Sequence, residues 1–148
     1  MNFKPVVPTL FLDFDGVLHP NGADVADYFC RANLLALTVA EFDLDVVISS
    51  SWRFHHPFKR LLGHFPDSFR RKITGMTGDA YIGKHARWNE LRKYIQTYGI
   101  DNWRALDDSG FEFPPGCPEL ILCDGARGAQ ERELNQIRDW LAMSRTHQ

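Results

Sequence analysis

The sequence is poor in cysteine, with only three in 148 residues, and none of them forms a Cys-x-x-Cys motif. An odd number of isolated thiols argues against a disulfide framework and against the usual zinc motifs. The chain also lacks an apolar run near the roughly 20 residues that a membrane-spanning helix requires. The first five residues carry one lysine and no apolar centre, unlike a secretory signal. These absences predict a cytoplasmic protein with no membrane partner.

Internal repeats, low-complexity tracts and Gly/Ser linkers are absent as well. A chain of this length has the size of a common globular domain and buries roughly two thirds of its unfolded surface. Its composition, with 44% hydrophobic and 24% charged residues, is ordinary for a soluble globular protein. We therefore expect residues 1–148 to form a single domain, and the sequence leaves the oligomeric state open.

The net charge of −2 hides an uneven distribution. Residues 53–93 contain ten Lys or Arg against three Asp or Glu, a net charge of +7. The flanking segments are acidic, with two against seven in residues 1–52 and five against nine in residues 94–148. Such asymmetry indicates a face that meets an anion, and a nucleic acid fits it. The alternative is that these basic residues are solvated helix surface.

Short apolar segments bounded by charged or turn residues predict four buried parallel strands, over 9–13, 45–49, 104–107 and 119–123. Apolar residues at helical spacing predict helices over 32–42, 58–65, 87–98 and 130–142. Strands that alternate with helices of this size favour right-handed βαβ crossovers, with helices on both faces of the sheet. The expected fold class is α/β, a Rossmann-like three-layer sandwich with a mainly parallel sheet.

Two carboxylates, Asp13 and Asp15, follow the first predicted strand and precede Gly16. The carboxyl end of a strand is where open α/β sheets bind ligands. An acid at the tip of a buried strand requires a cation or hydrogen-bond donors. Two acids at this spacing can share one site, one facing a metal and the other a reacting oxygen. The alternative is an acidic turn that ends a strand.

The second predicted strand ends in three hydroxyl groups and a cation, in the run Ser49-Ser50-Ser51-Trp52-Arg53. Hydroxyl donors, together with the free backbone N–H groups of a following helix, suit a phosphate oxygen. The alternative is an ordinary helix cap, which is the commoner role of a serine cluster after a strand, with Ser51 as the expected capping residue.

Two further patterns lie later in the chain. A basic stretch opens the third predicted helix and holds two candidate cations, Lys84 and Arg87. A fixed cation near a phosphoryl group neutralises its charge and keeps a nucleophilic carboxylate ionised. The predicted strand over 104–107 ends in the acid pair Asp107-Asp108. Adjacent acids at a strand end are unfavourable without a counter-ion, and hard oxygen ligands of this kind suit Mg²⁺.

In their order along the chain, these four motifs resemble the haloacid dehalogenase (HAD) superfamily of phosphohydrolases. The Ser-Ser-Ser-Trp-Arg run and the Arg87-x-x-Glu90 helix opening are similar to the small phosphatase domains of RNA-repair and polynucleotide kinase-phosphatase proteins. The resemblance extends from the first predicted strand to the last helix. Only about thirty residues separate consecutive motifs, and the scaffold needs most of them, so we expect a capless, HAD-like domain.

The resemblance implies roles for individual residues. Asp13 would attack the phosphorus and become an aspartyl-phosphate, while Asp15 would protonate the leaving oxygen and later activate water. Ser49 and Ser50 would donate hydrogen bonds to the phosphoryl group. The implied ligands of Mg²⁺ are the carboxylates of Asp13 and Asp107, the backbone carbonyl of Asp15, and Asp108 either directly or through water.

The cation of the third motif has two candidates. Lys84 matches the residue type usual in the superfamily and also joins the expected phosphate-binding residues. Arg87 matches the spacing to the acid pair in the repair-type phosphatases. Both are kept as candidates, with Lys84 placed first.

The expected function is a Mg²⁺-dependent phosphatase whose open site accepts a phosphorylated substrate such as a nucleic-acid end or a nucleotide. Trp52, Phe54 and the pair His55-His56 can stack on a base beside the phosphate site. The alternative is that Trp52 belongs to the core and the histidines to a surface turn. A partner subunit that supplies the missing lid is a further possibility.

Two other function classes fit parts of the pattern. A phospho-acceptor signalling domain also combines acids, a hydroxyl and a lysine on a parallel sheet. In such domains, however, the acid pair follows the first strand, whereas here it comes last. A catalytically silent HAD-fold binding module is the other alternative, but it has no chemical reason to keep Asp15.

Overall fold

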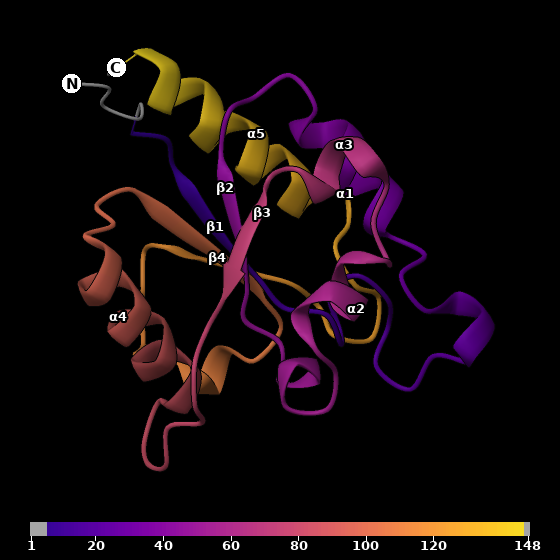
Figure 1. The fold of residues 1–148 in the computed structure, drawn as a ribbon, viewed down its shortest axis with the longest axis horizontal. Coiled ribbons are helices and arrows are strands. Elements are labelled where there is room, and N and C mark those ends of the chain that lie inside the picture. Colours follow the sequence, from indigo (N-terminus) through magenta and orange to yellow (C-terminus); the bar gives the residue numbers. More distant parts are fainter. Residues whose placement is uncertain (1–5, 147–148) are drawn as a thin grey trace.

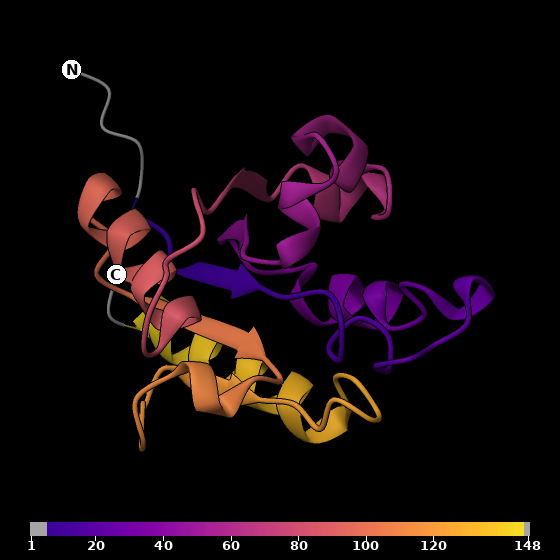
Figure 2. The same ribbon diagram turned by 90° about the horizontal axis from the view of Figure 1, so that it is seen from below.

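The computed structural model describes residues 6–146 and arranges five short strands in one parallel sheet. The strands are β1 (Thr9–Leu12), β2 (Asp45–Ile48), β3 (Ile73–Met76), β4 (Trp103–Asp107) and β5 (Leu120–Leu122). Their order across the sheet is β3-β2-β1-β4-β5. Figure 2 shows the arrows of β1 and β4 pointing the same way. The predicted α/β, Rossmann-like class is confirmed.

Helices connect these strands. The α-helices are α1 (Ala32–Val39), α2 (Phe58–Leu62), α3 (Asp67–Arg70), α4 (Ala86–Tyr98) and α5 (Glu131–Thr146). Short 3₁₀ helices cover Val25–Asp27 (η1), Ser51–Phe54 (η2) and Gly110–Glu112 (η3). The helix predicted over 58–65 ends earlier, at Leu62, and a separate turn of helix begins after Pro66. The other three predicted helices are present with shifted ends.

Side chains of each strand alternate between the two faces of the sheet, so each face has its own core. One core joins the sheet to α1, α2, α3 and α5, and its strand residues include Leu10, Leu12, Val46, Ile48 and Leu106. The other joins Phe11, Val47 and Ala105 to Leu91 of α4. Figure 1 shows α4 on one side of the sheet and α1, α3 and α5 on the other. This arrangement is the predicted three-layer sandwich.

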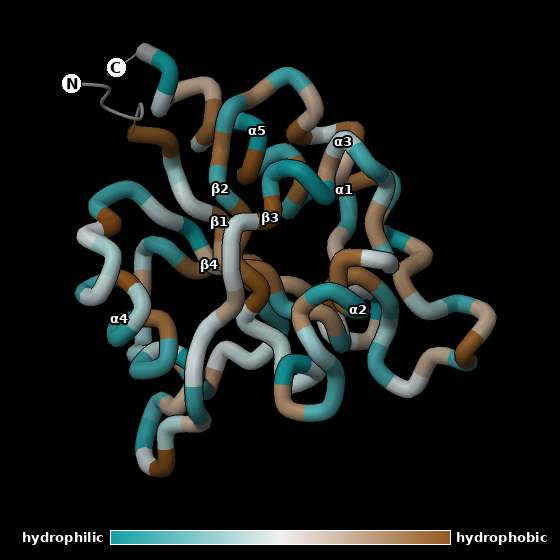
Figure 3. Tube along the Cα trace, viewed as in Figure 1, coloured by the Kyte–Doolittle hydropathy of each residue, from teal (hydrophilic) through white to brown (hydrophobic). Residues whose placement is uncertain are grey.

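Strand β3 was not predicted. Its sequence, Ile-Thr-Gly-Met, contains one buried residue, Ile73, and a glycine, which strands usually avoid. The glycine has a packing reason, because a Cβ at Gly75 would lie 2.4 Å from the hydroxyl oxygen of Tyr94 in α4. Figure 3 shows hydrophobic segments along the central strands and many hydrophilic ones along the outer loops. At this edge of the sheet, the strand is defined by close packing against α4, and its sequence lacks the run of apolar residues that marks the other strands.

The register of the central strands places the site. Leu12 of β1 pairs with Ile48 of β2 on one side and with Leu106 of β4 on the other. The next residues along these strands therefore emerge side by side at the carboxyl edge. The strand order reverses between β1 and β4, which is the position where α/β sheets bind ligands.

No cap domain interrupts the described part of the chain, since the segments between successive strands contain only the helices and short loops named above. None of the helices within residues 6–146 is long and apolar enough to cross a membrane. The site at the carboxyl edge is therefore built from the residues that end the strands and from the loops and helices that follow them.

Candidate active site

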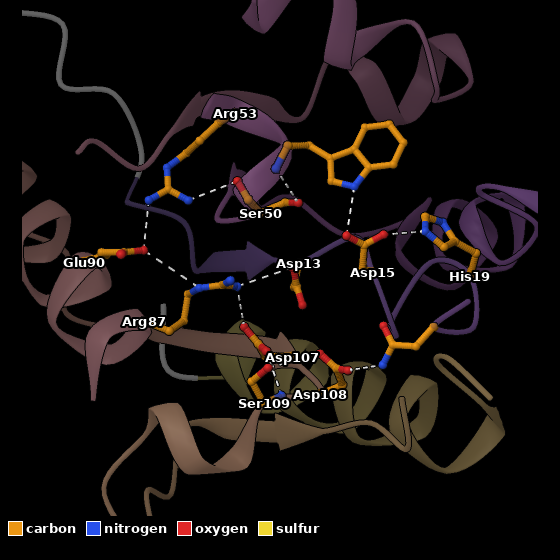
Figure 4. Close-up of polar contacts among 12 residues, drawn as sticks. Asp13, Asp15, His19, Ser50, Arg53, Arg87, Glu90, Asp107, Asp108 and Ser109 are labelled. Atoms are coloured by element: carbon orange, nitrogen blue, oxygen red, sulfur yellow. Dashed lines mark hydrogen bonds and ion pairs between the residues drawn. The ribbon is translucent and has the colours of Figure 1, made fainter. Parts of the chain in front are cut away.

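Asp13 lies at the centre of the carboxyl edge, directly after β1, and is 5% exposed. Its backbone N–H donates to the carbonyl oxygen of Leu106 at 3.1 Å, which extends the pairing of β1 with β4. Arg87, from the first turn of α4, reaches across the edge. Its Nη1 lies 2.8 Å from Oδ2 of Asp107 and 3.4 Å from Oδ1 of Asp13 (Figure 4). The structure thus brings three of the predicted site residues into direct contact.

Burial dominates the electrostatics of this group. It raises the pKa of the Asp13 carboxyl well above the ordinary value, and the nearby charge of Asp107 raises it further against the opposing effect of Arg87. Burial also raises the pKa of Asp107. Burial alone would lower the pKa of the Arg87 guanidinium, but Asp107 and Asp13 together raise it above its ordinary value. One arginine is therefore not enough to compensate the two carboxylates.

A third carboxylate completes an acidic cluster. Asp13, Asp107 and Asp108 each offer one oxygen, and these atoms all lie within 4.8 Å of one another. Such a set of carboxylate oxygens, with too little positive charge beside it, fits a hard divalent cation. The structure therefore supports a metal site on three of the acids that the sequence predicted as ligands.

Asp108 is held in this cluster by Asn21, a residue that the sequence did not indicate. The side-chain amide of Asn21 donates to Oδ2 of Asp108 at 2.8 Å. Two glycines leave room for the carboxylate, because a Cβ at Gly16 would lie 2.1 Å from its Oδ2 and one at Gly125 would lie 2.5 Å from it. Asn21 and Asp108 are 87 positions apart, so no local pattern relates them.

Two serines of the cluster after β2, Ser49 and Ser50, are buried, and the second of them caps a helix. Ser49 is 1% exposed and follows β2 beside Asp13, with its backbone N–H donating to the carbonyl oxygen of Leu12 at 2.9 Å. The Oγ of Ser50 accepts a hydrogen bond from the backbone N–H of Trp52 at 3.2 Å and so caps η2. The cap expected at Ser51 therefore lies one residue earlier, at Ser50, whose hydroxyl hydrogen remains free to donate elsewhere.

The two candidate cations differ sharply in position. Lys84 is exposed, and within residues 6–146 its ammonium group forms no ion pair. Its backbone carbonyl accepts a hydrogen bond from the side chain of Asn89 at 3.1 Å. Arg87, in contrast, is mostly buried and contacts two of the acids. The geometry favours Arg87 as the cation of the third motif.

A second arginine, Arg53, is linked to Arg87 because both guanidinium groups lie against the carboxylate of Glu90. Oε1 of Glu90 accepts a hydrogen bond from Nη2 of Arg53 at 2.9 Å and lies 3.9 Å from Nε of Arg87. Its Oε2 accepts a hydrogen bond from the backbone N–H of Tyr81 at 3.0 Å. Arg53 also donates to the carbonyl oxygen of Ser50 at 3.0 Å. This buried network ties the loop after β2 to the start of α4 and fixes the guanidinium of Arg87.

Asp15 lies apart from the cationic network. Its side chain is 50% exposed, and its Oδ1 is 2.8 Å from Nε2 of His19. Its Oδ2 accepts a hydrogen bond from Nε1 of Trp52 at 3.0 Å. The sequence predicted Asp15 itself but neither partner: His19 follows in an irregular loop, and Trp52 was expected to stack on a base or to belong to the core. The ring of Trp52 does pack on the core, against Phe14.

The chain belongs to a family described as the HAD domain in Swiss Army Knife RNA repair proteins, and the match covers residues 9–134. No curated protein and no solved structure matched the chain. The matched range contains all five strands and every acid, hydroxyl and cation described above. The resemblance noted from the motifs is thereby confirmed, and membership supports a phosphohydrolase in general.

Proposed function

We propose that the protein is a Mg²⁺-dependent phosphatase that hydrolyses phosphate monoesters through an aspartyl-phosphate on Asp13. The observation that carries the proposal is the position of Asp13, at the topological switch point between Ser49 and Asp107, with Arg87 at 3.4 Å. We also propose that residues 1–148 form one domain, because every described strand joins the same sheet.

The acidic cluster fits Mg²⁺ by its chemistry. Carboxylates of Asp13 and Asp107 would hold the ion, with Asp108 binding directly or through water and the backbone carbonyl of Asp15 as a further ligand. When bound, the ion supplies positive charge that offsets these carboxylates and the phosphate oxygens. The raised pKa of Asp13 supports this assignment, because the buried carboxylate lacks sufficient compensation from Arg87 alone.

The reaction has two displacement steps on the protein. In the first, a carboxylate oxygen of Asp13 attacks the phosphorus, the bond to the leaving oxygen breaks, and Asp15 transfers its proton to that oxygen. In the second, Asp15 takes a proton from water, which attacks the phosphorus and releases inorganic phosphate from Asp13. Each step leaves Asp15 in the protonation state that the other requires.

The remaining residues bind the transferring group. The hydroxyl of Ser49, level with Asp13 on the neighbouring strand, would donate a hydrogen bond to a phosphoryl oxygen, with Ser50 as a second donor. Arg87 would offset the charge that grows on the phosphoryl oxygens. Lys84 is exposed in the turn just before this helix and would contact the distal part of a long substrate. We therefore assign the cation of the site to Arg87.

Nucleic-acid ends and nucleotides are the proposed substrate class. The family description refers to RNA repair proteins, and residues 53–93 carry a net charge of +7. Phe54, on η2, is 47% exposed, with the Arg53 guanidinium 4.1 Å from its ring centre. An exposed ring next to a phosphate site can stack on a base. Phe54 is a better candidate for this role than Trp52, whose ring is occupied by aromatic neighbours.

A phosphatase screen tests the proposal. The panel would contain nucleotides, RNA and DNA oligonucleotides phosphorylated at the 5′ or 3′ end, sugar phosphates and phosphopeptides, each with Mg²⁺ and with EDTA. We expect Mg²⁺-dependent phosphate release, strongest on nucleic-acid substrates, and its loss in Asp13→Asn. No release from any substrate would refute the enzymatic function, and full turnover in Asp13→Asn would refute the covalent role of Asp13.

A further inference from the structure

The surroundings of Asp15 show a feature that the proposed reaction does not by itself require. Both carboxylate oxygens are held by ring N–H groups, Oδ1 by His19 at 2.8 Å and Oδ2 by Trp52 at 3.0 Å (Figure 4). The rest of the carboxyl group faces outward, since half of the side chain is exposed. Asp15 is thus fixed from two sides and open on a third.

The hydrogen bonds of His19 assign its tautomer. Its Nδ1 accepts a hydrogen bond from the backbone N–H of Phe29 at 3.2 Å, so this nitrogen carries no hydrogen. The hydrogen of the neutral ring is therefore on Nε2, which donates it to Asp15. Phe29 has a φ of 63°, a backbone conformation that bulky residues rarely adopt, and this conformation accompanies the contact of its N–H with His19.

Packing fixes both donor rings. His19 is 1% exposed and stacks on Tyr28 with ring centres 4.8 Å apart. The Trp52 ring packs edge-on against Phe14 at 5.8 Å and Phe29 at 5.2 Å. Neither donor can turn away without disturbing this aromatic cluster. The cluster therefore acts as a rigid support for one functional group, the carboxyl of Asp15.

We infer that His19 and Trp52 are positioning residues, which direct the carboxyl group of Asp15 at the leaving oxygen of the substrate. This inference rests on the proposed phosphatase function. As the bond between phosphorus and the leaving oxygen breaks, the proton of Asp15 passes to that oxygen, and the bonding pair stays on the oxygen. His19 and Trp52 keep their own hydrogens throughout and stabilise the carboxylate that remains.

A positioned acid matters most when the leaving group is strongly basic. Phenyl phosphate and p-nitrophenyl phosphate provide a matched pair of substrates, because they differ only in a nitro group that makes p-nitrophenolate the weaker base. Their kcat/KM values report on the step in which the leaving group departs. The ratio of the two values therefore measures how well Asp15 delivers its proton, and it does not change when a variant merely lowers the fraction of folded enzyme.

The variants for this test are Trp52→Phe, which keeps the ring and removes its N–H, and His19→Leu, which removes both ring nitrogens. Since misplacing a catalytic group can cost about 10²-fold, we expect kcat/KM for phenyl phosphate to fall by about 10- to 100-fold. The value for p-nitrophenyl phosphate should fall by less than about a third of that factor. His19→Gln should recover much of the loss, because its amide N–H can donate to Asp15. Tyr28→Phe keeps the ring that stacks on His19 and removes a hydroxyl that forms no hydrogen bond with Asp15 in the described residues, so it should leave both values unaltered.

Equal losses on both substrates in Trp52→Phe and His19→Leu, or no loss at all, would overturn the positioning role while leaving the proposed phosphatase intact. A wild-type protein that hydrolyses neither substrate nor any member of the screening panel would refute the proposed function, and this inference with it. Thermal unfolding of each variant, followed in parallel, identifies any loss that comes from the fold.

Discussion

Replacing Arg87 by methionine should destabilise the protein strongly, because it leaves buried acids without their cation. At an effective dielectric constant of 20, a charge pair at 2.8 Å, the distance from Arg87 to Asp107, is worth about 6 kcal/mol. The pair with Asp13 at 3.4 Å is worth about 5 kcal/mol on the same basis. Desolvation of the guanidinium offsets much of this sum. Breaking a buried ion pair by removing one partner costs about 3–5 kcal/mol, which is the loss we expect.

The matched control is Lys84→Met, a change from cation to the same apolar residue three positions earlier. Because Lys84 is exposed and forms no ion pair in the described part of the chain, its loss should change stability by less than about 0.5 kcal/mol. Urea unfolding of both variants at pH 7 in EDTA measures the difference. Phosphatase activity should fall by about 10²–10³-fold in Arg87→Met and far less in Lys84→Met.

The pH dependence follows from the direction of the pKa shifts. Burial already raises the pKa of Asp13 and Asp107 in the folded protein, and loss of Arg87 would raise both further. A carboxyl group whose pKa is higher in the folded protein than in the unfolded chain destabilises the folded state at pH values above the folded pKa. At pH values below the unfolded pKa it has no such effect. The gap between wild type and Arg87→Met should thus be largest near neutral pH and close on acidification. Equal losses in the two methionine variants, or a gap below about 1 kcal/mol at pH 7, would refute this reasoning.

Two further predictions concern the acidic cluster. Asp107→Asn removes a carboxylate whose pKa is raised by burial and leaves Arg87 paired with Asp13, so stability at pH 7 without metal should fall far less than in Arg87→Met. The Mg²⁺-induced stabilisation, about 2.7 kcal/mol at 100 times Kd in wild type, should vanish in thermal unfolding. An undiminished Mg²⁺ effect would contradict the assigned ligand. Gly16→Ala should weaken Mg²⁺ binding as well, because its Cβ would lie 2.1 Å from Oδ2 of Asp108. Gly116→Ala is the control: its φ of 72° is similar to the 75° of Gly16, but no atom lies within 4 Å of the new Cβ. Both variants strain the backbone, but only Gly16→Ala also displaces Asp108, so the difference in their Mg²⁺ affinities, measured by isothermal titration, reports that displacement. Equal affinities in the two variants would show that Asp108 had not moved.

The parts of the site that lie on strand ends could be predicted from the sequence. Asp13, Ser49 and Asp107 each end an apolar run, and parallel strands bring their carboxyl ends to one edge. Four of the five strands were found in this way. The edge strand β3 was missed because its pattern is set by contact with α4 at Gly75, and not by burial on both faces.

The contacts between loops could not be predicted in the same way. Trp52 and Asp15 are 37 positions apart, and the hydrogen bond between them depends on how two irregular segments pack. The choice between Lys84 and Arg87 depends on a difference of less than one helical turn. The helix begins at Ala86, which places Arg87 in the first turn facing the acids and leaves Lys84 in the preceding loop. Residue type alone does not contain that information.

The charges around the two functional aspartates differ in a way that fits their proposed roles. The network around Asp13 contains two arginines, Arg53 and Arg87, and the acids Asp13, Glu90, Asp107 and Asp108. Four acids against two cations leave a charge of −2, which a single divalent ion balances. Asp15, in contrast, is held by neutral donors alone within the described residues. Hydrogen bonds from cations are roughly twice as strong as neutral ones, and a cationic partner would oppose protonation of its carboxylate. A group that must gain and lose a proton in every cycle is therefore better oriented by neutral rings than by an arginine.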